Sequence, residues 1–156
     1  MKTVSNTKIF VDTNILFYLT NPNDPFGHEA KGRVHELYEN NNELFISNPV
    51  IREYAFSILR NATYHKMPFP QSVFTLIANI NTFRKSFIVI SEHKDNLDNW
   101  LVILPQLTSY KDVYDFNIAA TMKSEGIKYI LTHNVSDFKK FDSWLTVLPL
   151  LKNIEK

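Results

Sequence analysis

The stretch Ile9-Phe10-Val11-Asp12-Thr13-Asn14 places three apolar residues directly before an aspartate, a threonine and an asparagine. A short apolar run bounded by polar residues predicts a buried strand over residues 9–12. We expect the chain to turn into a helix over residues 13–19. The carboxylate of Asp12 should then stand at the carboxyl end of the strand. Because Asp and Thr also cap helices, a purely structural role for Asp12 or Thr13 stays open at this point.

The rest of the chain alternates expected strands with expected helices. The further strands are predicted over residues 44–47, 87–90, 127–132 and 145–148. The further helices are predicted over residues 28–40, 48–61, 71–85, 95–104 and 113–125, with a short turn or helix over 137–141. This alternation predicts a three-layer α/β/α sandwich around a mainly parallel sheet of four to five strands. In such sheets, ligand sites form beyond the carboxyl ends of the strands.

Several helix boundaries are marked by particular residues. Asn48 is predicted to cap the third helix, with Pro49 at its first position. Pro68 and Pro70 mark a loop before the next helix. Gly126 is expected to end the helix that precedes it.

Length and composition describe an ordinary globular protein. The 156 residues favour a single domain over 1–156, and 44% hydrophobic residues can build a core. The absence of cysteine excludes disulfides and thiolate chemistry and fits a cytoplasmic location. No apolar run approaches the roughly 18 residues of a membrane span. The net charge of +1 does not by itself identify a partner.

Two more acids, Glu53 and Asp115, are candidates for a functional role. Glu53 lies near the start of its helix, at the margin of the apolar face, although a solvated glutamate is the usual alternative. Asp115 lies inside a helix, where Asp has poor propensity, next to the small pair Ala119 and Ala120. A surface aspartate is the alternative there, and Asp112 competes with it as the helix cap.

A fourth candidate segment follows the strand at 127–132. This strand should deliver Thr132, Asn134 and Asp137 to its carboxyl end, and their oxygens suit a hard cation or its waters. Capping by Asn134 or Ser136 is the structural alternative. Phe138 is expected to fill the core in either case.

Taken in order, these segments resemble the PIN-domain family, of the kind found as the VapC toxin of bacterial toxin–antitoxin pairs. Each segment is weak evidence alone, but together they stand in the family's order and cover nearly the whole chain. The matching stretches are Phe10-Val11-Asp12-Thr13-Asn14, Asn48-Pro49-Val50-Ile51-Arg52-Glu53, Val113-Tyr114-Asp115-Phe116-Asn117-Ile118-Ala119-Ala120 and Ile130-Leu131-Thr132-His133-Asn134-Val135-Ser136-Asp137-Phe138.

The resemblance implies an endoribonuclease that depends on Mg²⁺ or Mn²⁺. Asp12, Glu53 and Asp115 match the three core acids of the family, with Glu53 acting directly or through a metal-bound water. Many members carry Asp where this chain has Asn134, so the pocket has one charge fewer and a second metal site is in doubt. Asp137 matches the acid before the phenylalanine and is a further metal-site candidate.

The resemblance also implies partners: an RNA substrate, an antitoxin protein that masks the pocket, and a second copy of the chain in a homodimer. Thr13 and Thr132 could bond a phosphate or orient a carboxylate. Arg52, Arg60 and Lys66 could form a basic rim for RNA phosphates, although each alone suits a solvated helix face.

Two other functions compete with the nuclease. A response-regulator receiver or a phosphatase also uses an aspartate at a strand end with Mg²⁺, but the chain lacks the paired acids and the late lysine expected for it. A non-catalytic RNA- or protein-binding module with the same fold is the other alternative. The near-complete set of acids argues against that module.

Overall fold

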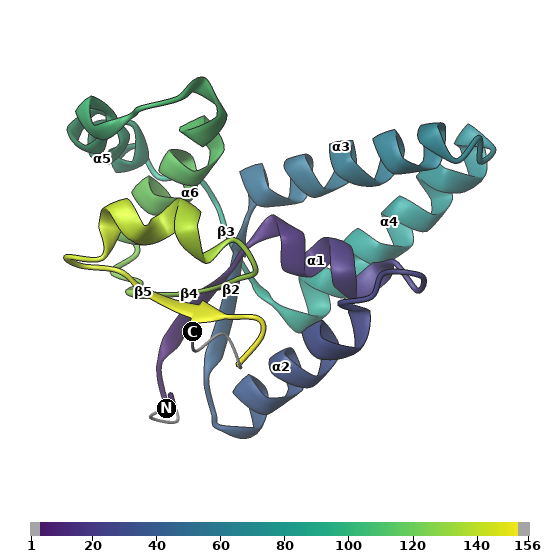
Figure 1. The fold of residues 1–156 in the computed structure, drawn as a ribbon, viewed down its shortest axis with the longest axis horizontal. Coiled ribbons are helices and arrows are strands. Elements are labelled where there is room, and N and C mark those ends of the chain that lie inside the picture. Colours follow the sequence, from purple (N-terminus) through teal and green to yellow (C-terminus); the bar gives the residue numbers. More distant parts are fainter. Residues whose placement is uncertain (1–3, 153–156) are drawn as a thin grey trace.

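The computed structural model describes residues 4–152 and places a parallel sheet between two layers of helices (Figure 1). Its five strands stand in the order β3-β2-β1-β4-β5, and every neighbouring pair is parallel. The strands are β1 (Lys8–Val11), β2 (Glu43–Ser47), β3 (Ile88–Ile90), β4 (Tyr129–Thr132) and β5 (Thr146–Pro149). The predicted α/β/α sandwich with a parallel sheet is therefore confirmed.

Helices cover both faces of this sheet. They are α1 (Thr13–Thr20), α2 (Gly27–Glu39), α3 (Asn48–Tyr64), α4 (Phe69–Ser86), α5 (Asp95–Ile103) and α6 (Val113–Ser124). Figure 1 shows α1 to α4 on one side, with α3 and α4 forming a long hairpin, and α5 and α6 on the other. Short 3-10 turns cover Leu104–Gln106, Tyr110–Asp112 and Val135–Phe141. Among the described residues, no helix is both long and apolar enough to span a membrane.

The central strand β1 and its neighbour β4 lie inside the core because helices bury both of their faces. Ile9, Phe10 and Val11 of β1 are fully buried, and so are Ile130 and Leu131 of β4. A strand covered on both faces carries a continuous apolar run rather than an alternating one. The apolar run before Asp12 therefore reflects the strand's central position in the sheet.

Two predicted helix starts are wrong by one or two residues. Ser47, not Asn48, caps α3: its backbone is extended and its hydroxyl accepts a 3.4 Å hydrogen bond from the backbone N–H of Val50. Helix α4 begins at Phe69, so Pro70 lies in its first turn and not in a loop. Proline is tolerated there because the first turn needs no N–H donor.

The predicted end of α6 and the predicted core phenylalanine are both confirmed. Gly126 has a φ of 65°, and the N–H of Ile127 donates to the carbonyl of Met122 at 2.9 Å. This left-handed residue after the helix satisfies a carbonyl that would otherwise lack a partner. Phe138 is fully buried.

A buried tyrosine joins the helices on one face of the sheet. Tyr54 of α3 is fully buried, and its hydroxyl lies 2.8 Å from Thr20 of α1. The amide of Asn79 on α4 donates to the same hydroxyl at 2.8 Å. This contact holds α1, α3 and α4 together close to the position of Glu53.

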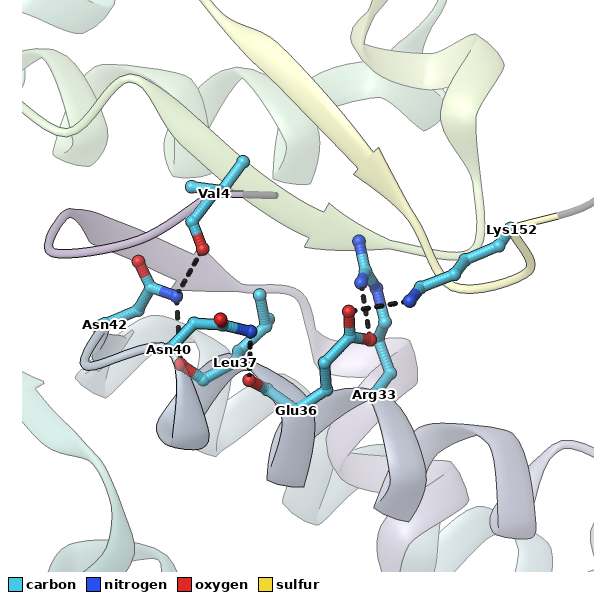
Figure 2. A network of polar contacts seen from close by, with 7 residues as sticks. All are labelled: Val4, Arg33, Glu36, Leu37, Asn40, Asn42 and Lys152. Carbon is cyan, nitrogen blue, oxygen red and sulfur yellow. Dashed lines mark hydrogen bonds and ion pairs between the residues drawn. The ribbon is translucent and has the colours of Figure 1, made fainter. Parts of the chain in front are cut away.

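A second polar network ties both ends of the described chain to the end of α2 (Figure 2). The amide of Asn42 donates to the carbonyls of Val4 and Leu37, each at 2.9 Å. Glu36 accepts from Arg33 at 2.8 Å and from Lys152 at 2.6 Å. Burial alone would raise the pKa of Glu36, but the hydrogen bonds from Lys152 and Arg33 lower it below its ordinary value.

We predict that Glu36→Gln destabilises the fold by about 1–2 kcal/mol, between the values typical of exposed and buried ion pairs. The Arg33 side chain is only 9% exposed, so removing its partner leaves a poorly solvated cation. Chemical denaturation measures the loss. Glu39→Gln on the same helix is the matched control, since the Glu39 side chain is 70% exposed. Equal losses in both variants would contradict the prediction.

Candidate active site

Asp12 stands at the carboxyl end of β1, where it is also the N-cap residue of α1. One carboxylate oxygen accepts a 2.7 Å hydrogen bond from the backbone N–H of Thr13. The other accepts from the hydroxyl of Thr132 at 2.6 Å and from the amide of Asn14 at 2.7 Å. The capping role left open by the sequence is therefore real. These three hydrogen bonds also hold the carboxylate of Asp12, a residue only 6% exposed, in one orientation.

Thr132 reaches Asp12 because β1 and β4 are neighbouring parallel strands. Their register pairs Val11 with Leu131, so the next residue on each strand meets at the same sheet edge. The Thr132 hydroxyl also accepts from the backbone N–H of Asn134 at 3.0 Å and from the amide of Asn14 at 3.1 Å. With these bonds made, a fully buried Thr132 orients the carboxylate of Asp12 rather than facing a ligand.

Glu53 enters the site from α3, which packs against α1. The hydroxyl of Thr13 donates to a Glu53 oxygen at 2.7 Å. Residues 12 and 13 therefore contact both β4 and α3, and they bring Glu53 to the edge where Asp12 stands.

Asp115 lies in the first turn of α6, on the other face of the sheet. It is partly buried and lines the same pocket as Asp12 and Glu53. The neighbouring Asp112 occupies the cap position but makes no side-chain cap. Its carboxylate instead accepts from Lys140 at 2.7 Å and from Thr108 at 3.2 Å. The two aspartates thus have separate environments, and only Asp115 faces the acidic cluster.

Burial and mutual repulsion both act on these acids. Burial is the largest cause that raises the pKa of Asp12 to about 6, against the hydrogen bond from Thr132, and the charge of Glu53 raises it further. Burial likewise raises the pKa of Asp115 to about 7, helped by the charges of Asp12, Asp137 and Glu53 and opposed by Lys140. Charges that repel one another across a partly buried pocket favour binding of a cation.

The acids line one open pocket of about 510 Å³, which we call the acidic pocket. Of the residues singled out from the sequence, it brings together Asp12, Thr13, Glu53, Asp115 and Asn134. Asp137 is not among its lining residues, although its charge raises the pKa of both Asp12 and Asp115.

The expected basic rim is only partly assembled. Arg60 lines the acidic pocket, whereas Arg52 lies in the neighbouring hollow that shares Glu53 and Arg60 with it. Lys66 lies in the turn between α3 and α4 with a φ of 55° and does not line the acidic pocket.

Sequence reasoning missed part of the wall that α3 contributes. Ser57, Asn61 and Tyr64 line the acidic pocket together with Glu53 and Arg60. These positions follow one another at intervals of three and four residues, which places them along one helix face. That spacing, counted from Glu53, is the signal that would have found them. Asn14 is a further omission, because its amide bonds were not apparent from the motif alone.

The donor chemistry of this pocket fits a hard divalent cation. Across residues 4–152, no three carboxylate or imidazole groups already stand close enough together to enclose an ion. Mg²⁺ does not require such a cage, because it keeps several waters and takes only one or two carboxylates directly. Asp12, Glu53 and Asp115 supply oxygen ligands that repel one another, and they could hold such an ion with its waters.

Comparison with known proteins identifies the fold. Residues 9–143 match the family described as PIN domain. No curated protein sequence matches the chain.

Among solved structures, VapBC2 from Rickettsia felis bound to a promoter DNA fragment matches with a TM-score of 0.66 at 16% identity, covering 91% of this chain and 98% of that one. FitAcB from Neisseria gonorrhoeae matches with a TM-score of 0.67 at 14% identity, covering 91% and 97%. VapC20 from Mycobacterium tuberculosis, a Sarcin-Ricin loop cleaving toxin, matches with a TM-score of 0.58 at 21% identity, covering 88% and 96%.

The raised pKa values predict that the metal-free protein loses stability as pH rises. The folded state binds more protons than the unfolded chain between about pH 4 and pH 7, so the free energy of unfolding falls across that window. For Asp12 alone the cost is about 3 kcal/mol once both states are ionised. Thermal melts in EDTA at pH 5 and pH 7.5 measure this change.

The same melts, repeated with variants and with added cations, test which groups cause the change. Asp115→Asn should remove much of the fall, while Asp98→Asn, an exposed aspartate on α5, should not. Added Mg²⁺ or Mn²⁺ should raise the melting temperature at pH 7.5, and Asp12→Asn should weaken that rise. A pH-independent melting temperature with no response to either cation would count against the pocket.

Proposed function

This chain belongs to the PIN-domain family, and from that premise we propose that it is an endoribonuclease that uses Mg²⁺ or Mn²⁺. The observation that carries the proposal is the meeting of Asp12, Glu53 and Asp115 in one pocket at the carboxyl edge of the sheet. Asp12 follows β1, whereas Glu53 lies on α3 and Asp115 on α6, so only the folded chain brings them together. Such a set of acids suits a phosphodiesterase better than it suits a structural surface.

In the proposed reaction, water attacks an RNA phosphodiester and the bond to the leaving oxygen breaks. A bound Mg²⁺ or Mn²⁺ lowers the pKa of a coordinated water and stabilises charge on the phosphoryl oxygens. Asp12 and Asp115 would hold the ion, with Glu53 acting directly or through a water. Asp137 acts on this set through its charge.

The chain's own residues orient these ligands. Thr132 and Asn14 donate hydrogen bonds to one oxygen of Asp12, and Thr13 at the start of α1 donates to Glu53 of α3. Arg60, on the pocket wall, is placed to bind an RNA phosphate beside the acids. Asn134 lines the pocket as a neutral side chain, so it can donate to a phosphate oxygen without repelling it.

We further propose that the protein is the toxin of a toxin–antitoxin pair. Structures with the same fold include the VapBC2 and FitAcB proteins named above. A hollow of about 660 Å³ next to the acidic pocket offers a place for an apolar segment of an antitoxin. Ile58, Ala62 and Met67 give it an apolar wall, and it shares Asn61 with the acidic pocket. A homodimer remains a prediction from the resemblance.

The direct test is RNA cleavage by the purified protein in Mn²⁺, Mg²⁺ or EDTA. We expect cleavage with either cation and none in EDTA. Asp12→Asn and Asp115→Asn should each lower the rate by at least about a hundredfold, since each removes a metal ligand. Cleavage that persists in Asp12→Asn would come from a contaminant. No cleavage of any RNA by the unaltered chain would favour the binding module, and a phosphoryl group trapped on Asp12 would favour the receiver or phosphatase.

A second prediction tests Thr132 as a positioning residue. Thr132→Val removes the hydroxyl that orients Asp12 and should cost about 10- to 100-fold in activity or metal affinity, as outer-shell partners of metal ligands do. The loss should appear partly as a higher Mn²⁺ concentration for half-maximal rate. Thr132→Ser should restore it. Thr75→Val, at an exposed threonine of α4, is the matched control and should leave the Mn²⁺ dependence unchanged.

A further inference from the structure

The side chains of Tyr18, Phe26 and His133 form a small cluster beside the acidic pocket, which we call the histidine cluster. The ring centroid of His133 lies 5.5 Å from that of Tyr18 and 4.3 Å from that of Phe26. All three residues are partly buried, and Tyr18 also lines the acidic pocket. Within residues 4–152, none of the three donates a hydrogen bond to Asp12 or Glu53, so the cluster does not hold these acids directly.

Two hydrogen bonds join His133 to helix α1. The hydroxyl of Tyr18 lies 3.0 Å from Nδ1 of His133, and the backbone N–H of His133 donates to Oδ1 of Asn14 at 3.3 Å. Asn14 and Tyr18 are four residues apart on α1, so their side chains stand on the same face of the helix. The segment that follows β4 is therefore bonded to α1 at two successive turns.

The bond from His133 determines which way the amide of Asn14 points. Because Oδ1 of Asn14 accepts from His133, its Nδ2 is turned toward Asp12 and Thr132. It donates to the carboxylate of Asp12 at 2.7 Å and to the hydroxyl of Thr132 at 3.1 Å. An inverted amide would place its oxygen against the Asp12 carboxylate, where both groups are acceptors. Asp12 thus receives this hydrogen bond because His133 fixes the amide from the other side.

The ring of His133 is fixed on two sides. Phe26 packs against it edge to face, a favourable arrangement for aromatic rings, and the Tyr18 hydroxyl bonds to Nδ1. Burial raises the pKa of Tyr18, and the charges of Asp24 and Asp12 raise it further. The phenol therefore keeps its proton at neutral pH. Fixing the ring also fixes the backbone N–H of the same residue, which is the donor to Asn14.

We propose that Tyr18 and His133 are positioning residues for the metal site. Tyr18 holds His133, His133 orients the amide of Asn14, and Asn14 orients the carboxylate of Asp12. Neither Tyr18 nor His133 touches the cation; both act through Asn14. This inference rests on the proposed nuclease function for the bound metal, whereas the orientation of Asn14 belongs to the metal-free chain as well. A purely structural role would affect stability alone, whereas positioning affects metal affinity.

The first experiment measures Mn²⁺ affinity by electron paramagnetic resonance of the free ion. Tyr18→Phe removes the hydroxyl but keeps the ring, and it should weaken Mn²⁺ binding about three- to tenfold. This loss is smaller than that of a direct outer-shell partner, because Tyr18 acts through two further residues. Tyr38→Phe on α2 is the matched control, since its hydroxyl donates to the carbonyl of Ser86 and it does not line the acidic pocket. Equal affinity in the unaltered chain and Tyr18→Phe would overturn the proposal.

The second experiment tests whether the hydrogen bond at Nδ1 is the cause. His133→Ala should weaken Mn²⁺ binding at least as much as Tyr18→Phe. His133→Asn keeps a polar atom near the place of Nδ1 and should bind Mn²⁺ more tightly than His133→Ala. In a Tyr18→Phe background this advantage should disappear, because the partner hydroxyl is gone. His35→Ala, at an exposed histidine of α2, is the control and should not change the affinity. An asparagine variant as weak as the alanine variant would contradict the proposal.

Cleavage assays separate positioning from direct contact with RNA. Tyr18→Phe should raise the Mn²⁺ concentration for half-maximal rate, while the rate at saturating Mn²⁺ stays within about twofold of the unaltered chain. A lower rate at saturating Mn²⁺, with unchanged Mn²⁺ affinity, would show that Tyr18 contacts the substrate. That result would overturn its assignment as a positioning residue.

A measurement on the metal-free chain distinguishes failure of this inference from failure of the nuclease proposal. The Nδ2 hydrogens of Asn14 bond to Asp12 and Thr132, so they should exchange slowly with solvent in nuclear magnetic resonance experiments. Tyr18→Phe should speed this exchange several-fold, and Tyr38→Phe should not. Faster exchange in a chain that binds no Mn²⁺ would support the positioning of Asn14 and sink the nuclease. Unchanged exchange in a chain that binds Mn²⁺ would sink the positioning role and leave the nuclease standing.

Discussion

The hydrogen bond from Thr132 to Asp12 is the contact on which this site depends. It joins the carboxyl ends of the central strand β1 and its neighbour β4, where each strand leaves the sheet. Because both strands are buried on each face, the backbone that carries these side chains has little freedom to move. Asp12 is thereby held in a fixed orientation before any ligand arrives. Asn14 and Thr13 extend the same arrangement to α1 and, through Glu53, to α3.

This arrangement concentrates negative charge where burial makes it unfavourable. The raised pKa values of Asp12 and Asp115 record that cost, which hydrogen bonds to Asp12 only partly offset. A fold with no use for the charge would gain stability from neutral side chains at these positions. Retaining acids in such a pocket is typical of functional sites, where stability is exchanged for binding of a cation. The apolar core formed by the strands beneath the pocket offsets this loss of stability.

Helix α3 connects the acids to the surroundings of the site. Its start is capped by Ser47, its buried face is held by Tyr54, and another face carries Glu53 and Arg60 past the acidic pocket. The apolar periodicity of this helix was readable from the sequence. The residues of α3 that line the acidic pocket beyond Glu53 and Arg60 were harder to find, because polar residues at helical spacing are ordinarily solvated. The residues of α1 and α6 that complete the pocket are also distant in sequence. The capping error at Asn48 has a local cause instead, because the neighbouring residues Ser47 and Asn48 both suit a helix cap.

The sequence by itself determined the alternation of strands and helices, the parallel α/β/α architecture and the three acids worth considering, because periodicity and residue type are local properties. It also indicated Phe138 as core and Gly126 as a helix end. Only the tertiary structure decided that Asp115 rather than Asp112 faces Asp12, that Thr132 is buried against a carboxylate, and that Arg52 lies outside the acidic pocket. These outcomes depend on strand order and helix placement, which join residues more than a hundred positions apart and leave no trace in the local pattern.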